Sequence, residues 1–325
     1  MSEVAHRETP EMSVILTTDT RDTIRGVLRR MQQQTAQGRL EIIMVVPRGA
    51  GAAFTEADAQ GFAGFRVVEI DDFQPLSKAR AAGVRAASAP LVFMGETHAY
   101  PHREWAAALI AAGRRGDYGA ISPAFLNGNP RGAVSWAGFI ADYGAWSDGH
   151  PEGEIPAAPL FNSAYRRSAL VEMGDRLEPS LAQGDELPLA LRSRGYRAYF
   201  AADAPIEHFN NATFGSWAKE IFFIGLTIGG YRARRWSLAR RAAYVAASPL
   251  IAMVLARRFF ECIRSFPKIK SVPILAFPLV FIGAAIRAAG EMVGYTLGVS
   301  LRHELLAEQY ELHKVSIAIG RQGSA

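Results

Sequence analysis

Cysteine is almost missing from this sequence, which limits what can hold the fold together. Cys262 is the only cysteine among 325 residues, so no intramolecular disulfide framework can form, as expected for a reducing compartment. The composition has no low-complexity or repeated segment, and at 49% hydrophobic it suffices for one large domain plus an accessory region. The first eleven residues lack the apolar core of a signal peptide, so we expect the start of the chain to stay in the cytoplasm.

Acidic residues are absent from one basic stretch, 231–241, which carries five arginines. A basic cluster of this kind can face nucleic acid or anionic lipid. No nucleic-acid-binding motif accompanies it, whereas two uncharged apolar runs follow it, at 242–255 and 271–286. The sequence therefore favours an anionic membrane surface as a partner and argues against nucleic acid.

The N-terminal part alternates short apolar runs with helical patterns. We expect strands at four apolar runs, namely 12–17, 41–46, 65–70 and 91–95, and helices over 21–31, 76–87 and 102–114. Strands that alternate with helices predict an α/β fold, in which a single, largely parallel sheet is covered by helices on both faces. Ligands of such sheets bind beyond the carboxyl ends of the strands.

From 118 to 163 the pattern loosens into glycine, proline, asparagine and aromatic residues, which is typical of a binding loop. The segments expected after it are a helix over 162–173, a helix over 186–194, and two short strands at 197–201 and 204–208. Beyond Asn211 the composition shifts to aromatic, arginine and long apolar runs, so we expect the domain boundary there.

Several polar residues follow the expected strands. Glu96 and His98 come directly after the apolar run 91–95, and a carboxylate and an imidazole there could share a divalent cation; as a pair they could equally be ordinary loop residues. Asp185 and Glu186 open an expected helix, where one of them could act as a base, although acids also favour helix N-termini for electrostatic reasons.

The remaining candidates would contact a bound phosphate or nucleotide. His208 follows an expected strand and could be a second metal ligand, a phosphate contact or a structural histidine. Lys78 and Arg80 lie in a loop-to-helix stretch, where they could meet a diphosphate or simply form a solvated helix face. The end of the first strand contributes three more candidates: Thr17, Thr18 and Asp19.

The order of these segments resembles that of the family 2 glycosyltransferases, which have the GT-A fold. MSVILTT and LEIIMVV resemble the opening strand–helix–strand of that family, LSKARAAGVRAASAPLVFMGE resembles its next segment, and GDELPLALRSRGYRAYF resembles the helix that carries its catalytic base. IEH resembles its later histidine. The resemblance spans residues 12–210. It implies a nucleotide-sugar donor, a divalent cation (Mg or Mn) and transfer with inversion.

The chain also departs from the family pattern. Val-Pro-Arg at 46–48 replaces the family's Asp pair after the second strand, and Glu-Thr-His at 96–98 replaces its Asp-x-Asp metal motif. The following residues resemble a subgroup with an acidic-His-Pro-Trp phrase. The helix of the base is about two residues short, so Asp185 and Glu186 stay alternatives for the base.

The two apolar C-terminal runs are short for a membrane crossing. They hold fourteen and sixteen residues, each with proline, whereas a spanning helix needs about twenty. Extending the second run brings in Arg287 and Glu291, and if both runs crossed as a hairpin the basic segment 257–270 would lie outside the cell. We therefore rank helices that lie in the membrane interface first, helices buried against protein second, and spanning helices third.

These observations predict an inverting glycosyltransferase at the cytoplasmic face of the inner membrane. It would transfer sugar to a membrane-proximal or lipid-linked acceptor in cell-envelope glycan or glycolipid assembly. The expected parts are a polar extension (1–11), a GT-A-like domain (12–211), membrane-associated helices (212–301) and a tail (302–325). The alternatives are a non-catalytic scaffold subunit, favoured by the lost Asp motifs, and a transferase to polyprenyl phosphate, whose anionic acceptor needs little help from a base.

Overall fold

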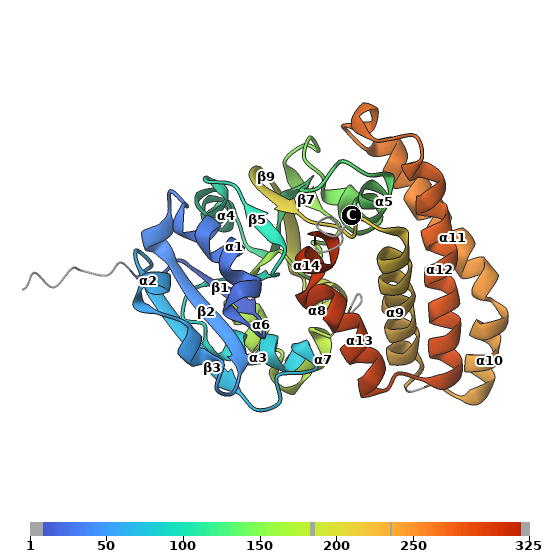
Figure 1. The fold of residues 1–325 in the computed structure, drawn as a ribbon, viewed down its shortest axis with the longest axis horizontal. Coiled ribbons are helices and arrows are strands. Elements are labelled where there is room, and N and C mark those ends of the chain that lie inside the picture. Colours follow the sequence, from blue (N-terminus) through green and yellow to red (C-terminus); the bar gives the residue numbers. More distant parts are fainter. Residues whose placement is uncertain (1–8, 183–185, 235, 320–325) are drawn as a thin grey trace, which may run out of the picture. The chain divides into compact units, whose positions relative to one another are not determined.

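The computed structural model describes residues 9–182, 186–234 and 236–319. The chain divides into two compact units, Met1–Ala124 with Pro151–Glu207 and Phe125–His150 with His208–Ala325. Figure 1 labels most of their helices and strands. The expected domain boundaries stay a prediction.

The strands of the described residues form one sheet in the order β3-β2-β1-β4-β8-β6-β9-β5, with β7 paired to β9. Their bounds are β1 Met12–Thr17, β2 Leu40–Pro47, β3 Gly64–Ile70, β4 Leu91–Gly95, β5 Ala99–Pro101, β6 Tyr118–Asn127, β7 Gly153–Ile155, β8 Ala164–Arg166 and β9 Arg197–His208. The divisions between the units fall inside β6 and β9, which are continuous strands.

The expectation of a largely parallel sheet holds for one half only. Strands β1 to β4 pair in parallel, with Met12 opposite both Leu40 and Leu91. In contrast, β8 is antiparallel to β4 and β6, and β7 is antiparallel to β9. A parallel pair needs a crossover connection, usually a helix. The segment 156–163 before β8 is irregular. This is consistent with the antiparallel pairing of β8, because an antiparallel strand needs no helical crossover.

The helices of the first unit follow its strands. They are α1 Arg21–Gln32, α2 Glu56–Ala59, α3 Leu76–Ala86, α4 Trp105–Arg115, α6 Arg167–Val171, α7 Leu177–Ser180 and α8 Glu186–Ser193, with 3₁₀ turns η1 Gln37–Arg39, η2 Gly51–Ala53 and η4 Gly174–Arg176. The Thr20 hydroxyl caps α1 by accepting from the Thr23 N–H, as Thr does at helix N-termini. Gly83 lets α3 approach β1, because a Cβ there would lie 2.5 Å from Ile15.

A buried polar pair fixes the entry to β4. Glu41 on β2 is 4% exposed. It accepts hydrogen bonds from the Ser13 hydroxyl at 2.5 Å and from the Ser88 N–H at 2.9 Å. The Ser13 oxygen accepts in turn from the Ala89 N–H at 3.0 Å. These bonds tie the segment before β4 to β1 and β2, which sets where the residues after β4 emerge.

The expectation of a binding loop over 118–163 is wrong for much of its length. The segment contains the ten-residue strand β6 and the helix α5 Ala133–Tyr143. Gly119 and Pro123 interrupt the strand pattern in the sequence, but burial of the apolar residues between and after them favours the strand. Gly119 also lies against Tyr196, where a Cβ would come within 2.5 Å of that side chain.

Three further boundaries differ from expectation. Residues 162–173 are not one helix, since β8 precedes α6. The two short strands over 197–208 are the single strand β9, which continues through exposed Asp203. The helix expected over 102–114 starts only at Trp105, because β5 and a turn occupy 99–104.

The second unit is helical. Beyond α5 and the turn η3 Gly144–Trp146, it contains α9 Phe214–Ala233, α10 Leu238–Ala246, α11 Ser248–Ser265, η5 Ile269–Ser271, α12 Ala276–Leu297, α13 Leu301–Leu312 and α14 Lys314–Ile319. Helix α12 packs on α9, α11, α10 and α5, and α13 packs on α9.

Glycines let α9 and α12 touch along their backbones. Gly225 and Gly229 on α9 are four residues apart, as are Gly290 and Gly294 on α12. A Cβ at Gly225 would lie 2.2 Å from the carbonyl oxygen of Arg287, and one at Gly294 would lie 2.3 Å from that of Leu226. Small residues spaced by four allow this close packing, which is common between helices in membranes.

A buried carboxylate lies at this helix contact. Glu291 on α12 is 1% exposed. Its carboxylate lies 3.1 Å from Arg232 and 3.7 Å from Arg287, and it accepts a hydrogen bond from the Tyr295 hydroxyl at 2.7 Å. The two charges expected to interrupt the apolar run are therefore paired with each other, and α12 continues through them for 22 residues.

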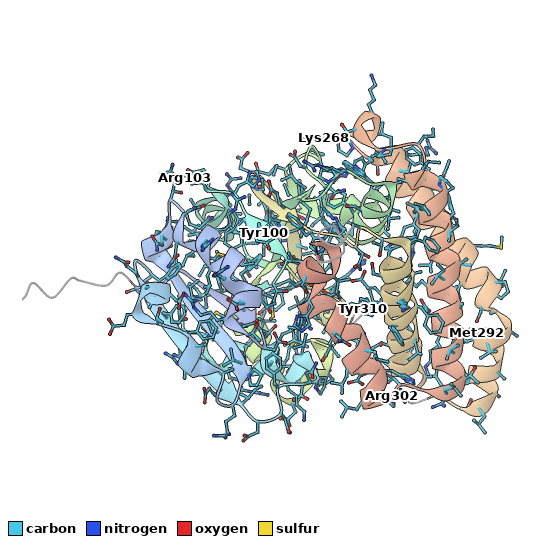
Figure 2. The ribbon with its side chains drawn as sticks, viewed as in Figure 1. Tyr100, Arg103, Lys268, Met292, Arg302 and Tyr310 are labelled. Carbon is cyan, nitrogen blue, oxygen red and sulfur yellow. The ribbon has the colours of Figure 1, made fainter. Side chains whose placement is uncertain are left out.

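Helix α12 is long and apolar enough to cross a membrane, by length and composition alone, with a mean hydropathy of 1.5 over 18 residues. Helices α10 and α11 pass the same test only together, with a bend of 59° between them. The exposed residues of α12 form an uncharged stripe at helical spacing: Pro278, Phe281, Ile282, Ala285, Ala289, Met292, Thr296 and Leu297. Figure 2 labels Met292 on this helix.

Several arginines of the cluster at 231–241 have partners within the second unit, and contact of the cluster with lipid stays a prediction. Arg232 pairs with Glu291, and Arg234 lies 3.2 Å from Glu304. Arg240 stacks over Trp236, and Arg241 donates to the Ala233 carbonyl. Residue 235 lies outside the described residues. The acids that neutralise Arg232 and Arg234 come from α12 and α13, far along the chain.

Candidate functional site

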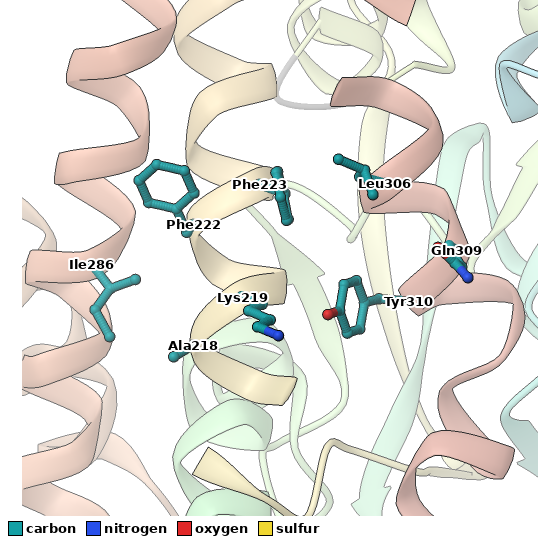
Figure 3. A pocket seen from close by; sticks show the side chains of 8 residues that line it. All are labelled: Ala218, Lys219, Phe222, Phe223, Ile286, Leu306, Gln309 and Tyr310. Carbon is teal, nitrogen blue, oxygen red and sulfur yellow. The ribbon is translucent and has the colours of Figure 1, made fainter. Parts of the chain in front are cut away.

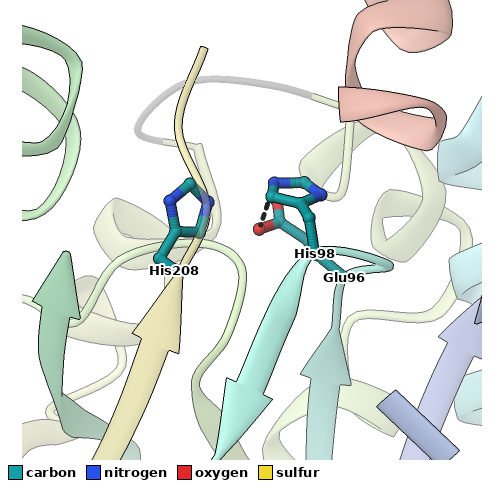
Figure 4. A group of neighbouring side chains, drawn as sticks. All are labelled: Glu96, His98 and His208. Atoms are coloured by element: carbon teal, nitrogen blue, oxygen red, sulfur yellow. Dashed lines mark ion pairs between the residues drawn. The ribbon is translucent and has the colours of Figure 1, made fainter. Parts of the chain in front are cut away.

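The candidate site begins at the carboxyl end of β4. Glu96 and His98 follow this strand directly and are 8% and 0% exposed. Figure 4 shows the ion pair between them, with His98 Nε2 3.5 Å from Glu96 Oε2. Burial of a carboxylate is costly unless hydrogen bonds or a cation compensate its charge. The site therefore needs groups that stabilise Glu96.

Asn162 supplies two of these interactions. Its amide nitrogen donates to Glu96 Oε2 at 2.5 Å, and its Oδ1 accepts from the Glu96 N–H at 3.2 Å. Asn162 is fully buried and has a φ of 54°, a left-handed conformation that asparagine tolerates better than most residues. Its own N–H donates to the Met94 carbonyl at 2.7 Å. Asn162 thus fixes both the backbone and the carboxylate of Glu96.

Arg80 lies beside the loop that carries Asn162. It is 6% exposed, and its guanidinium lies 3.7 Å from the centre of the Phe161 ring, within range of a cation–π interaction. Lys78 is more exposed and pairs with Asp72 at 3.0 Å. Arg80 therefore supports the loop around Asn162, and contact of either residue with a diphosphate stays a prediction.

His208 is the last residue of β9 and is 1% exposed. Its Nδ1 lies 2.9 Å from Asn210 Oδ1. The amide nitrogen of Asn210 already donates to Asn127 Oδ1 at 3.2 Å and to the His208 carbonyl at 3.1 Å. The Asn210 oxygen must therefore accept, so His208 carries its proton on Nδ1 and presents the lone pair of Nε2.

Glu96, His98 and His208 form a group of possible metal ligands at one edge of the sheet. Each offers one ligand atom, and these atoms lie within 4.8 Å of one another; Figure 4 shows the three side chains. A carboxylate with two imidazoles is a donor set that fits a divalent transition-metal ion. The grouping favours the metal-ligand role among the three roles that the sequence left open for His208.

The expected nucleotide contacts lie at the end of β1. Thr17 and Thr18 are 5% and 0% exposed. The Thr18 hydroxyl donates to the Thr20 carbonyl at 2.7 Å, and its N–H donates to the Val45 carbonyl at 3.1 Å. Asp19 accepts from the Thr23 hydroxyl at 3.4 Å. These bonds shape the turn into α1, and contact with a nucleotide stays a prediction.

The two candidate bases are unequally placed. Asp185 lies outside the described residues, so its position is not assigned. Glu186 is the first residue of α8 and is exposed. An exposed carboxylate at a helix start is available to a ligand and also suits the helix dipole, so the choice between the two stays open.

Arg48 stands where the sequence lacks the usual Asp pair after β2. Its guanidinium donates to the Asp71 carboxylate just beyond β3, at 2.6 Å from Nη2. This hydrogen bond holds the pKa of Asp71 below its usual value. Arg48 after β2 and Asp71 after β3 thus form an exposed ion pair.

Comparisons with known proteins bear on the fold. No protein-family model matches the chain, and no curated protein matches it in sequence. The chain is similar to a solved structure of GalNAc-T7 with UDP, GalNAc and Mn²⁺, with a TM-score of 0.50 and 12% identity over 69% of this chain and 50% of that one. It also matches the mannosyltransferase PcManGT from Pyrobaculum calidifontis in complex with GDP-Man and Mn²⁺, with a TM-score of 0.46 and 18% identity over 94% and 81%.

The first likeness shows a shared fold. It confirms the expected GT-A-like α/β architecture, with the mixed sheet described above. The chain spans half the length of the GalNAc-T7 structure, so activity and substrates remain matters for proposal. The assignment to family 2 in particular stays a prediction.

Sequence reasoning missed the residues that hold the ligands. Asn162 and Asn210 carry no motif, since a single asparagine in a loop is common and both act through hydrogen bonds to residues distant or adjacent in the chain. Phe161, on whose ring Arg80 stacks, likewise lies in no sequence motif. The segments GETH and IEH gave the sequence signals for this site.

Proposed function

We propose that this protein is a metal-dependent glycosyltransferase, which moves a sugar from a nucleoside diphosphate to a membrane-proximal or lipid-linked acceptor with inversion. The observation that carries the proposal is the buried Glu96–His98 pair at the carboxyl end of β4, in a GT-A-like fold. Ligands of open α/β sheets bind at this edge. The solved structures similar to the chain are described with UDP or GDP-Man and with Mn²⁺.

In this proposal Glu96, His98 and His208 hold the cation, and Asn162 and Asn210 orient them. A divalent ion bound there would neutralise the charge that develops on the departing diphosphate. Two imidazoles favour a transition ion such as Mn²⁺ over Mg²⁺, which prefers oxygen ligands.

The attacking hydroxyl of the acceptor needs a base. Either Asp185 or Glu186 would accept its proton as the oxygen attacks the anomeric carbon from the face opposite the diphosphate. If the acceptor is instead a phosphate, it is already anionic, and neither carboxylate is needed.

The second unit would bring the enzyme to the cytoplasmic face of the inner membrane, for cell-envelope glycan or glycolipid assembly. The uncharged exposed stripe of α12 supports an apolar contact with lipid. Three exposed basic residues on and after α11 have no acidic partner among the described residues and could meet anionic headgroups: Arg258, Arg264 and Lys270.

Calorimetry of the full chain with UDP- and GDP-sugars tests the proposal. We expect donor binding that requires Mn²⁺ and that Glu96→Ala abolishes without loss of folding. Glu104→Ala is the matched control, because Glu104 is exposed and, among the described residues, its carboxylate accepts a hydrogen bond only from Thr35. NMR of the product would show whether the anomeric configuration inverts. A folded protein that binds no nucleotide sugar in the presence of any divalent metal ion would instead support the non-catalytic scaffold. The replaced Asp motifs favour that alternative.

A further inference from the structure

An apolar groove lies within the second unit, between α9, α12 and α13. Its volume is about 530 Å³, within the roughly 300–1,000 Å³ typical of small-molecule sites. Phe222 and Phe223 on α9 and Leu306 on α13 form much of its wall, as Figure 3 shows. A wall of this composition suits a hydrocarbon ligand.

The groove has polar groups at one part of its lining. Lys219 extends from α9, and Gln309 and Tyr310 face it from α13 (Figure 3). Lys219 is exposed and has no acidic partner among the described residues. The neighbouring acid, Glu220, points to Lys314 at 2.9 Å and to Asn211 at 2.5 Å. The charge of Lys219 is therefore available to an anion.

An ammonium, a phenol hydroxyl and an amide N–H together suit a phosphate, since all three can donate hydrogen bonds to its oxygens. The apolar wall beside them suits the chain that such a phosphate would carry. The groove also borders α12 at Ile286. The exposed neighbours of Ile286 on that helix, Ile282, Ala285 and Ala289, belong to the uncharged stripe.

We propose that this groove binds the hydrocarbon chain of a single-chain lipid phosphate, with the phosphate at Lys219, and that this lipid is the acceptor. The identification as acceptor rests on the proposed function; the binding site itself does not. A single groove of this volume holds one chain, so the proposal selects a single-chain phosphate over a two-chain bilayer phospholipid.

Equilibrium dialysis of radiolabelled dodecyl phosphate, below its micelle concentration, tests the site. The full chain is kept in a sterol-based detergent, which has no alkyl chain to compete. Ala218 lines the groove, so Ala218→Trp should fill it and weaken binding at least tenfold, while Ala218→Ser should not. Lys219→Gln should weaken binding about tenfold or more, the size of a lost charge-assisted hydrogen bond. It should leave binding of dodecanol unchanged.

Arg302→Gln is the control for charge, because Arg302 is exposed in the same unit and does not line the groove. Equal losses of dodecyl phosphate binding in Lys219→Gln and Arg302→Gln would reduce the effect to surface charge and overturn the proposal. Unchanged binding of dodecyl phosphate by both Ala218→Trp and Lys219→Gln would also overturn the proposal. Competition by phosphatidylglycerol vesicles as strong as that by unlabelled dodecyl phosphate would overturn the choice of a single-chain lipid.

Donor binding, measured on the same samples, separates this inference from the proposed function. If Mn²⁺-dependent donor binding is present and dodecyl phosphate does not bind, the groove is not a lipid site and the glycosyltransferase proposal stands. If dodecyl phosphate binds with the expected pattern of variants and no donor does, the site stands and its identification with an acceptor falls.

Discussion

Asn162 is the residue whose replacement most sharply tests the candidate site. Its side chain makes one hydrogen bond to the Glu96 carboxylate and one to the Glu96 N–H. A bond to a charged group contributes about 1.5–3 kcal/mol and a neutral one about 0.5–1.5 kcal/mol. Loss of both should therefore lower the free energy of unfolding by roughly 2–4 kcal/mol.

The backbone of Asn162 separates two variants. At a φ of 54° alanine is strained by about 1–2 kcal/mol and glycine is not, so Asn162→Gly should be more stable than Asn162→Ala by ~1 kcal/mol. At exposed Asp203 in β9, where the backbone is extended, the order should reverse, since glycine costs ~0.5–1 kcal/mol relative to alanine in a strand.

Urea unfolding followed by circular dichroism measures these differences, and calorimetry with Mn²⁺ measures the effect on the ligands. Loss of a group that orients a metal ligand weakens metal binding by about 10–100-fold, and both Asn162 variants should show it. An alanine variant as stable as the glycine variant would refute the left-handed conformation. Unchanged Mn²⁺ affinity in both variants would refute the role of Asn162 in holding Glu96.

Three other predictions concern separate parts of the chain. Asn210→Leu should weaken Mn²⁺ binding about 10–100-fold by freeing the tautomer of His208, and Asn210→Asp, which keeps the acceptor, should restore it; equal affinities by calorimetry would contradict this. Burial raises the pKa of Asp58, but hydrogen bonds from an arginine and a threonine outweigh it and leave the pKa lowered. Asp58→Asn should therefore cost about 1–2 kcal/mol of stability at pH 7. That difference is complete above the unfolded pKa of about 3.9 and is lost as pH falls through the lower folded pKa, which unfolding at pH 7 and pH 3 would show. Gly290→Leu should prevent α9 and α12 from packing, because a Cβ there lies 2.2 Å from a backbone oxygen, whereas Gly215→Leu, with open space around it, should leave the melting temperature nearly unchanged.

The sequence predicted the elements whose pattern is local. Strands β1 and β4 coincide with their expected bounds because continuous apolar runs of five or six residues are typical of strands buried on both faces. Helix α1 follows the spacing of its four buried residues and its threonine cap. Strand β6 was missed because glycine and proline are poor strand formers, and in this case burial outweighed that preference.

The candidate site shows where a single sequence stops being informative. Glu96 and His98 could be marked as a pair because only one residue separates them. The place of His208 beside them depends on how β9 joins the sheet, which local pattern does not encode. Asn162 depends on a left-handed backbone at a position with no turn motif. The ligands were thus predictable by type, and the groups that orient them were not.

In the C-terminal helices, too, contacts between residues distant in the chain change what the local sequence pattern indicates. In the sequence, Arg287 and Glu291 shorten the second apolar run to below the length of a membrane crossing. In the structure they neutralise each other with Arg232, a residue 59 positions from Glu291, and both α12 charges are removed from the exposed stripe. Charge in a helix therefore excludes contact with lipid only on the face that carries it. The outer face of α12 stays uncharged from Pro278 to Leu297, and contact of this face with a membrane stays a prediction. Glu291→Gln should weaken the α9–α12 contact without adding a charge to that face.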